Sequence, residues 1–255
     1  MLSAVSGFSL EDDVLTFALY VAALCHDVDH CGTTNQYLIA TGHVRSLRYR
    51  GFAPQEMHHA SIACELISEH RLVPRHIADT FKCHVASLIL STNIASHDAF
   101  MADFDGGDGE MRAMLLLKCA DLGHAFAPLD AHVLWVDRLQ AEFYAQGDKE
   151  KVHGFPVAAM FDRESEYDVS VTQPQFFRTV VVPLFALLFG TFGIVEAVER
   201  RLDDNLRHWD RNLAEHRRGA TKSLPLLKLS FRPKPLGSIN NLRAYAKSCT
   251  ILHDP

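Results

Sequence analysis

Apolar residues recur at three- and four-residue spacings through nearly the whole chain. The spacing covers residues 11–25, 56–70, 74–91, 110–122, 128–146, 173–196 and 198–215. It is the period of an α-helix with one buried face, and the alternating pattern of a half-buried strand is nearly absent. With 255 residues the chain is long enough to bury a substantial core. The sequence therefore predicts an all-α fold, arranged as a single compact multi-helix domain.

The composition is that of a soluble globular protein with an unusual number of histidines. Apolar residues make up 48% of the chain and charged residues 22%. The net charge of −6 argues against a general nucleic-acid-binding protein, so we expect no nucleic-acid partner. The 15 histidines point towards metal or proton chemistry.

Cysteine usage and the first residues indicate a cytoplasmic protein. The six cysteines form no CxxC pair and lie mostly in apolar helical segments, which is typical of reduced thiols rather than of disulfides. No positively charged start precedes the first apolar segment, and Glu11, Asp12 and Asp13 follow early, so we expect no signal peptide.

One segment is apolar enough to require a membrane test. Residues 179–195, "TVVVPLFALLFGTFGIV", carry no charge, and their length is at the lower limit for a membrane-spanning helix. The segment contains Pro183, Gly190 and Gly193, and no other part of the chain resembles a span. We therefore predict a buried core helix and no membrane span.

Two polar segments interrupt or follow the helical pattern. The acidic segment "DFDGGDGE", residues 103–110, resembles a calcium loop, but Gly107 and Met114 stand where an EF-hand needs its fifth and twelfth ligands. We expect a solvated loop between two helices there. From His216 to His253 the chain has eight Lys or Arg and no acid. We expect residues 216–255 to form a basic, flexible tail, with a membrane-surface or partner contact as the alternative.

The segment "CHDVDHCGTTN", residues 25–35, concentrates metal-binding side chains after an apolar run. His26 and His30 are four residues apart and would share one helical face, with Asp27 adjacent to His26. Imidazole with carboxylate suits a Zn²⁺-like ion, and a bridging carboxylate can bind a second, harder cation. Taken one at a time, these residues could equally be helix caps or surface acids.

Further motifs follow in a fixed order. They are "EMHHAS" (56–61), "LSTN" (90–93), "KCADLGH" (118–124), "WVDRLQAEFYAQGDKEK" (135–151), "AAMFDR" (158–163) and "QPQFF" (173–177). Together with the His-Asp motif, they resemble the catalytic domain of the class I 3',5'-cyclic-nucleotide phosphodiesterases from about residue 11 to about residue 210. The resemblance implies an all-α phosphohydrolase of the HD type. It would hydrolyse cAMP, cGMP or both to 5'-monophosphates in cyclic-nucleotide signalling.

The resemblance also implies a two-metal site. His26, Asp27 and Asp121 would ligate a Zn²⁺-like ion, and one of the two carboxylates would also reach Mg²⁺ or Mn²⁺. Asp27 and Asp121 would thereby act in catalysis, holding the metals that activate a bridging hydroxide. Further out, three residues match positions that hold waters of the second metal: His30, Glu56 and Thr92.

The nucleotide-binding residues follow from the same resemblance. Gln173 would hydrogen-bond the purine, since its amide both donates and accepts, and Phe176 would stack on the base. Leu139 would form the opposite wall, and Met160 and Phe161 would line the adjacent space. His124 stands at a position that influences base selectivity, and neither it nor Gln173 decides between cAMP and cGMP.

The sequence also departs from the family pattern. The family carries a His-Asn-x-x-His segment, with a general-acid His and a metal-ligand His, before the His-Asp motif, and no His precedes His26 here. Asn93 replaces the usual Asp. We therefore expect residues 1–215 to be a catalytic domain incomplete at its N-terminus, either a partial copy of an active enzyme or a genuine short form.

Two alternative functions remain open. A chain without the general acid but with Gln173 and Phe176 could be an inactive nucleotide-binding or regulatory module. A different phosphohydrolase could share only the His-Asp motif. The sequence does not reveal the oligomeric state.

Overall fold

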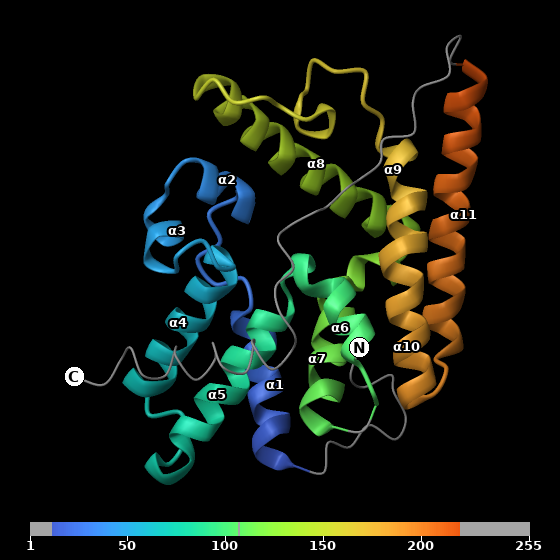
Figure 1. The fold of residues 1–255 in the computed structure, drawn as a ribbon. Helices are drawn as coiled ribbons and strands as arrows, with labels where there is room; N and C mark the ends of the chain where they lie inside the picture. The colour runs from blue at the N-terminus through green and yellow to red at the C-terminus, as the bar shows by residue number, and fades with distance from the viewer. Residues whose placement is uncertain (1–11, 107, 220–255) are drawn as a thin grey trace. The chain divides into compact units, whose positions relative to one another are not determined.

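The computed structural model describes residues 12–106 and 108–219. Over these residues the chain forms helices and connecting loops without a β-strand, which confirms the all-α prediction (Figure 1). The described residues group into two compact units, 12–121 and 122–219. The predicted basic tail lies outside the described residues except for 216–219, which continue the last helix.

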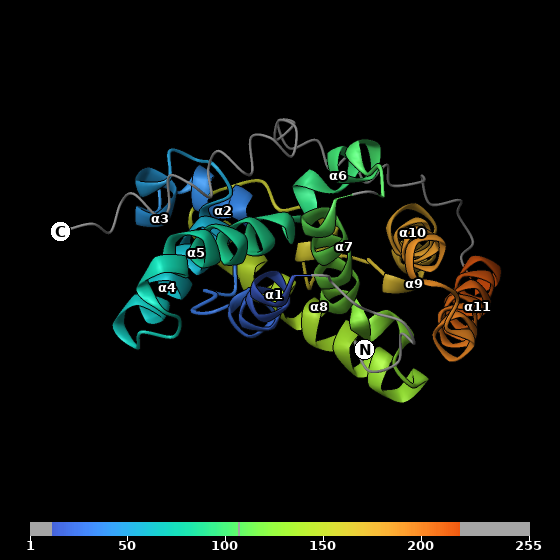
Figure 2. The ribbon, with the colours of Figure 1, turned by 90° about the horizontal axis from the view of Figure 1, so that it is seen from below.

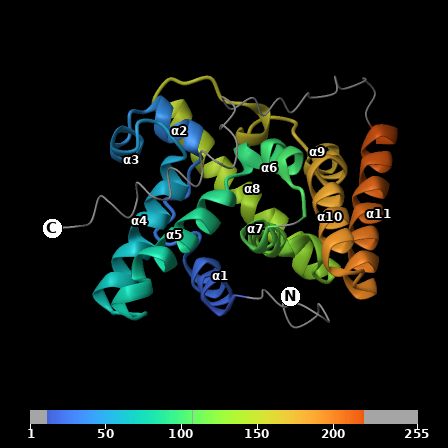
Figure 3. The same ribbon diagram turned by 60° about the horizontal axis from the view of Figure 1, so that its bottom comes forward.

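Residues 12–121 are organised around α5. The elements of this unit are α1 (Asp13–Cys25), α2 (Asn35–Ala40), α3 (Val44–Arg48), α4 (Pro54–Glu69), α5 (Arg75–Ser91), η2 (Ile94–Ser96), α6 (His97–Asp103) and α7 (Gly109–Asp121). α5 packs against α1, α4 and α7, and its fully buried residues include Phe81, Val85 and Leu88 (Figure 2). The short helices α2 and α3 contact α4 (Figure 3).

Residues 122–219 contain the two longest helices. The elements are η3 (Gly123–Phe126), α8 (Leu129–Val152), η4 (Ala159–Phe161), α9 (Val169–Phe176), the π-helical segment η5 (Phe177–Val181), α10 (Val182–Phe192) and α11 (Glu196–Gly219). α11 packs beside α9, as all three views show, and also contacts α8 and η3.

The helix boundaries differ from the predicted ones in several places, and α11 extends to Gly219 where we expected an end at residue 215. α8 continues through Gly147 to Val152, where we expected an end at residue 146. α9, η5 and α10 together run from Val169 to Phe192 rather than over 173–196, because Asp168 caps the start and Gly193, at φ 91°, ends the helix. The periodicity analysis missed α2, α3 and α6, which are too short to show a repeating pattern. The acidic segment does connect two helices, α6 and α7, as predicted.

The continuous helical stretch from Val169 to Phe192 satisfies the length and composition of a membrane-crossing helix, and 28% of its most apolar window is buried. Core helices of soluble proteins satisfy the same criteria, so this is weak support for a span. The absence of a membrane span stays a prediction.

His132 is the most completely enclosed polar residue of the second unit. Its Nδ1 donates to His124 O over 3.0 Å, and its Nε2 accepts from Trp209 Nε1 over 2.8 Å. The ring meets Phe177 edge-on with centroids 5.5 Å apart. Both ring nitrogens are therefore satisfied in the neutral form, and burial lowers the pKa of His132 to about 4.

Gly147 allows a close approach that fixes the segment bearing Met160 and Phe161. A Cβ on Gly147 would lie 1.8 Å from Phe161 O, so only glycine permits this contact between α8 and η4. We predict that Gly147→Ala lowers the free energy of unfolding by about 1–3 kcal/mol, as overpacking does. Gly190→Ala is the matched control, since Gly190 lies in α10 with open space around its Cβ position. It should raise stability by up to about 1 kcal/mol through helix propensity. Urea unfolding compares the two, and equal effects would contradict the packing argument.

His132 should make stability depend on pH. Because its folded pKa of about 4 lies below the ordinary 6.5, the unfolded chain takes up a proton first as the pH falls. Stability is therefore retained above pH 6.5 and lost between 6.5 and 4, by up to about 1.4 kcal/mol per pH unit. In His132→Gln this share of the pH dependence should disappear. Unfolding free energies at several pH values measure the slope, and an unchanged slope in the variant would show the assignment to be wrong.

Candidate functional site

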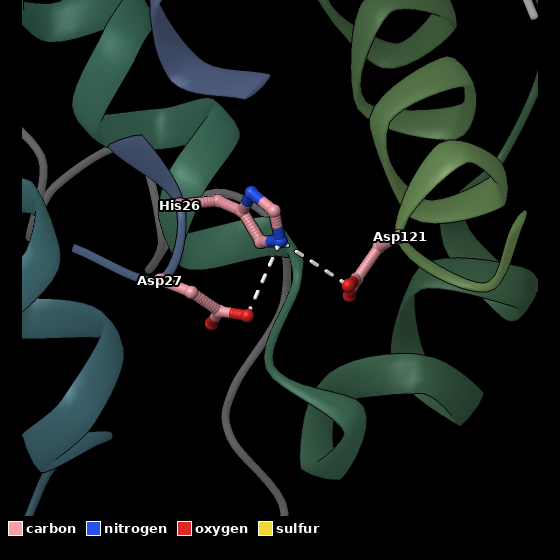
Figure 4. Close-up of side chains that lie close together, drawn as sticks. All are labelled: His26, Asp27 and Asp121. Atoms are coloured by element: carbon pink, nitrogen blue, oxygen red, sulfur yellow. Dashed lines mark ion pairs between the residues drawn. The ribbon is translucent and has the colours of Figure 1, made fainter. Parts of the chain in front are cut away.

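The structure brings His26, Asp27 and Asp121 together, although the chain separates Asp121 widely from the other two. Their ligand atoms all lie within 4.8 Å of one another. His26 Nε2 is 3.3 Å from Asp27 Oδ2 and 3.3 Å from Asp121 Oδ1 (Figure 4). We call these three residues the metal group.

The metal group lies at the C-terminal ends of α1 and α7, two helices that pack against each other. His26 is the C-cap of α1, and Asp121 is the last residue of α7. The C-terminal end of a helix carries a partial negative charge, so a carboxylate there is electrostatically unfavourable. Two carboxylates at two such ends create a site that favours a cation.

His26 is oriented to use its Nε2. Its Nδ1 lies 3.0 Å from Ala23 O, and because a carbonyl only accepts, Nδ1 is the donor. Hydrogen bonds to Asp121 and Asp27 raise the pKa of His26 to about 10. The two carboxylates thus favour positive charge at Nε2, whether a proton or a divalent cation supplies it. The residues present therefore fit a metal ion.

The segment after His26 corrects one prediction. α1 ends at Cys25, and residues 26–29 form turns in which Val28 N donates to Cys25 O and His30 N to Asp27 O. Asp29 adopts φ 59°, which stops the helix. We had expected from their spacing that His26 and His30 would share a helical face. This prediction is wrong, because the helix ends before His30.

Glu56 is placed near the metal group by Asn35. The Asn35 side chain accepts from Gln55 N over 2.9 Å and donates to Glu56 Oε2 over 2.8 Å, so it caps α4, whose own N-cap, Ala53, cannot do so. Burial raises the pKa of Glu56, and the charges of Asp27 and Asp121 act in the same direction. A cation at the metal group would relieve this repulsion.

The two other predicted water-holding residues are placed differently. His30 lies close enough to Asp27 for its charge to lower the pKa of that carboxyl, after the larger effect of the hydrogen bond from His26. Thr92 is the C-cap of α5, where its hydroxyl donates to Ile89 O. Asn93 is buried and accepts from Ala95 N, so it has a capping role of its own.

His59 belongs to the site and was missed in the sequence. Its Nδ1 donates to Val28 O over 2.6 Å, and burial lowers its pKa to about 4, which leaves a lone pair on Nε2. That Nε2 is buried, has no hydrogen-bond partner among the described residues, and lies 3.9 Å from Asp27 Oδ1. The signal was present, since Glu56 and His59 are three residues apart on α4 and share a face.

Lys118 was also missed, and it adds a buried positive charge one turn before Asp121. Its side chain is 4% exposed and donates to Ser91 O over 2.8 Å. Burial lowers its pKa to about 8, against the opposing effect of Asp121. The sequence did not indicate this placement, because a lysine inside an apolar helical segment could equally point into solvent.

The predicted base-binding residues lie in the second unit. Gln173 and Phe176 are three residues apart on α9. Gln173 Oε1 is buried and has no hydrogen-bond partner among the described residues. Phe176 is partly exposed, whereas the next residue, Phe177, is fully buried in the core. Phe177 is thus the core aromatic, and Phe176 remains available for another contact.

The remaining pocket candidates surround α8. Leu139 is 42% exposed and lies on α8 between the buried Val136 and the partly exposed Phe143. Phe161 of η4 packs on Phe143 with ring centroids 4.8 Å apart, and Met160 is its partly exposed neighbour. His124 of η3 stacks on the ring of His132.

Comparison with known proteins identifies a family whose members this chain resembles over most of its length. The 3'5'-cyclic nucleotide phosphodiesterase family matches residues 4–202. The chain is 29% identical over 233 residues to the human "High affinity cGMP-specific 3',5'-cyclic phosphodiesterase 9A", covering 80% of this chain and 39% of that protein. The Mus musculus protein of the same name is 32% identical over 208 residues, covering 75% of this chain and 39% of its own length.

A third relative and two crystal structures extend the comparison. A "Dual 3',5'-cyclic-AMP and -GMP phosphodiesterase beta" from Plasmodium falciparum is 25% identical over 224 residues, covering 80% of this chain and 20% of that protein. The phosphodiesterase domain of the Salpingoeca rosetta rhodopsin phosphodiesterase superposes with a TM-score of 0.74 at 24% identity, covering 80% of this chain and 68% of that one. A second structure of that domain gives 0.75, also at 24% identity, covering 85% and 74%.

The crystal structures establish the fold, and the chain spans 39% of the length of the mammalian relatives. The family match covers most of the residues, including the metal group and the predicted base-binding residues. This chain belongs to the 3',5'-cyclic nucleotide phosphodiesterase family.

Proposed function

We propose that this chain hydrolyses the 3',5'-cyclic phosphate of cAMP, cGMP or both to the 5'-monophosphate, in cyclic-nucleotide signalling. The observation that carries the proposal is the convergence of His26, Asp27 and Asp121 at two helix ends, in a chain of this family. The reaction breaks the P–O3' bond and adds water to phosphorus. We place this activity in the cytoplasm, in keeping with the reduced cysteines of the described chain.

Two divalent ions are part of the proposal. A Zn²⁺-like ion would be held by the metal group, since imidazole with carboxylates suits it, and Mg²⁺ or Mn²⁺ would share a carboxylate. Such ions polarise phosphoryl oxygens and activate water. His30, Glu56 and Thr92 would hold waters of the second ion. The buried Nε2 of His59 lies beside Asp27 and would accept a hydrogen bond there.

The residues of the second unit would bind the base. Gln173 would offer its unpartnered Oε1 and its amide N–H groups to the purine edge, and Phe176 would stack on the ring. Leu139, Met160 and Phe161 would supply the apolar walls. His124, held by His132, would contribute to base preference. The relatives' names include both a cGMP-specific enzyme and a dual cAMP and cGMP enzyme, so both nucleotides belong in the test.

Removing one carboxylate of the metal group should strongly weaken metal binding and abolish turnover. We predict that Asp121→Asn weakens Zn²⁺ binding by at least about 100-fold, beyond the 10–100-fold typical of changes outside the ligand set. Zn²⁺ at 100 times the wild-type dissociation constant should stabilise the wild-type chain by about 2.7 kcal/mol and the variant by about 0.4 kcal/mol or less. Competition with a chromophoric chelator measures the affinity, and release of 5'-AMP and 5'-GMP in Mg²⁺ or Mn²⁺ with trace Zn²⁺ measures the activity.

Asp79→Asn is the matched control for Asp121→Asn. Asp79 lies in the same unit, on α5, and its side chain is 90% exposed, so the variant removes one negative charge outside the site. It should behave as the wild type in both assays. The folded wild-type chain could bind Zn²⁺ and cyclic nucleotide without hydrolysing the nucleotide. That result would contradict the hydrolase proposal and indicate a nucleotide-binding module instead.

The base-binding role of Gln173 has its own test. We predict that Gln173→Ala weakens binding of a non-hydrolysable cyclic nucleotide by about tenfold, the worth of a buried hydrogen bond, without changing Zn²⁺ affinity. Gln175→Ala is the control, because Gln175 lies on the same helix but two residues along, on a different face. Calorimetric titration with cAMP and cGMP analogues compares them. Equal losses in the two variants would refute the assignment.

A further inference from the structure

The loop that carries Asp27 contains a residue in an unfavourable backbone conformation. Asp29 has φ 59°, in the left-handed region, where residues other than glycine are uncommon. It stands two residues after Asp27 and directly before His30. Such a conformation persists only where the surrounding contacts impose it, so its partners identify what holds this loop.

Arg45 of α3 makes three hydrogen bonds that hold Asp29 and its neighbour Gln55. Nη1 donates to Asp29 O over 2.9 Å and to Gln55 Oε1 over 2.8 Å, and Nη2 donates to Asp29 Oδ2 over 2.7 Å. The Arg45 side chain is 13% exposed, whereas that of Asp29 is 63% exposed. The guanidinium is therefore the fixed partner, and it holds both the backbone and the side chain of Asp29.

Two residues of α4 also hold the same loop. His58 Nε2 lies 2.8 Å from Asp29 Oδ2. The buried Gln55 donates through Nε2 to Thr33 O over 3.1 Å and to Cys31 Sγ over 3.2 Å. Arg45 contacts Asp29 and Gln55 together, so it joins the two ends of the loop.

We propose that Arg45 is a positioning residue for the metal group, which it serves by fixing the loop through Asp29 so that the Asp27 carboxylate already lies beside His26 before an ion binds. The inference rests on the proposed metal-binding function. Holding a ligand in place before binding removes an ordering cost that would otherwise reduce ion affinity. The guanidinium is suited to this role because its planar fork reaches a carbonyl and a carboxylate at once, which a lysine ammonium on a flexible stem does not.

The first test measures ion binding through the visible absorption of bound Co²⁺, which reports both affinity and coordination geometry. We expect Arg45→Met to weaken Co²⁺ binding by 10–100-fold and to alter the absorption bands. Arg45→Lys keeps the charge but loses the fork, so it should resemble Arg45→Met. The matched control is Arg48→Met, on the same helix, where the exposed Arg48 lies over the Tyr49 ring. It removes an equal charge and should leave affinity and spectrum unchanged.

The outcomes separate positioning from simple charge. If Arg45→Lys binds Co²⁺ as the wild type does, or if Arg48→Met loses as much affinity as Arg45→Met, the fork is not what matters and the proposal is overturned.

A second measurement is independent of metal binding. Amide hydrogen exchange of the metal-free chain reports on the turns formed by the Val28 and His30 amides. We expect these amides to exchange about tenfold faster or more in Arg45→Met, because a hydrogen bond to a charged group is lost, while α5 amides keep their rates. Unchanged exchange would refute the positioning role. The wild-type chain could bind no Co²⁺ while Arg45→Met still shows the expected faster exchange. That result would refute the metal-binding function and leave the role of Arg45 in holding the loop intact.

Discussion

Two carboxylates share one imidazole nitrogen, and the first unit of the structure is arranged to keep them there. Asp27 and Asp121 both lie 3.3 Å from His26 Nε2, at the C-terminal ends of two helices. Charge repulsion and the helix dipoles oppose this arrangement unless positive charge stands between the carboxylates. The packing of α1 and α7 against α5 supplies the rigidity that holds it. Apolar burial in these helices thus stabilises an arrangement that electrostatics alone would separate.

The sequence was sufficient for the helices that bury one face, and the three residues it predicted as metal ligands do lie close together in the structure. α1, α4, α5 and α7 appear within two residues of their predicted limits, because each has an apolar stripe long enough to show its period. The proximity of Asp121 to His26 was a different matter. Nothing in local spacing indicates it, and only the ordered set of family motifs led to that prediction.

The sequence was insufficient wherever distant side chains decide the backbone. No glycine or proline lies between Cys25 and His30, so local propensity would let α1 continue, yet Asp29 turns into the left-handed region. Arg45 and His58, from α3 and α4, fix that turn. Gly147 shows the converse, because a residue that usually ends a helix lies inside α8, where the close contact with Phe161 O demands it. In both cases tertiary contact overrides a local preference.

Two of the buried polar atoms that lack a partner among the described residues belong to residues of the proposed sites. Buried polar atoms in folded proteins are nearly always hydrogen-bonded, and His132 follows that rule with both ring nitrogens paired. His59 Nε2 and Gln173 Oε1 do not follow it, since neither has a partner among the described residues. Each costs free energy in the folded chain, on the order of 1–3 kcal/mol, and a ligand that supplies a donor recovers it. His59 and His132 are both buried and both have a pKa lowered to about 4, but only His59 keeps an unpartnered ring nitrogen, so of these two it is His59 that can accept a hydrogen bond from a ligand.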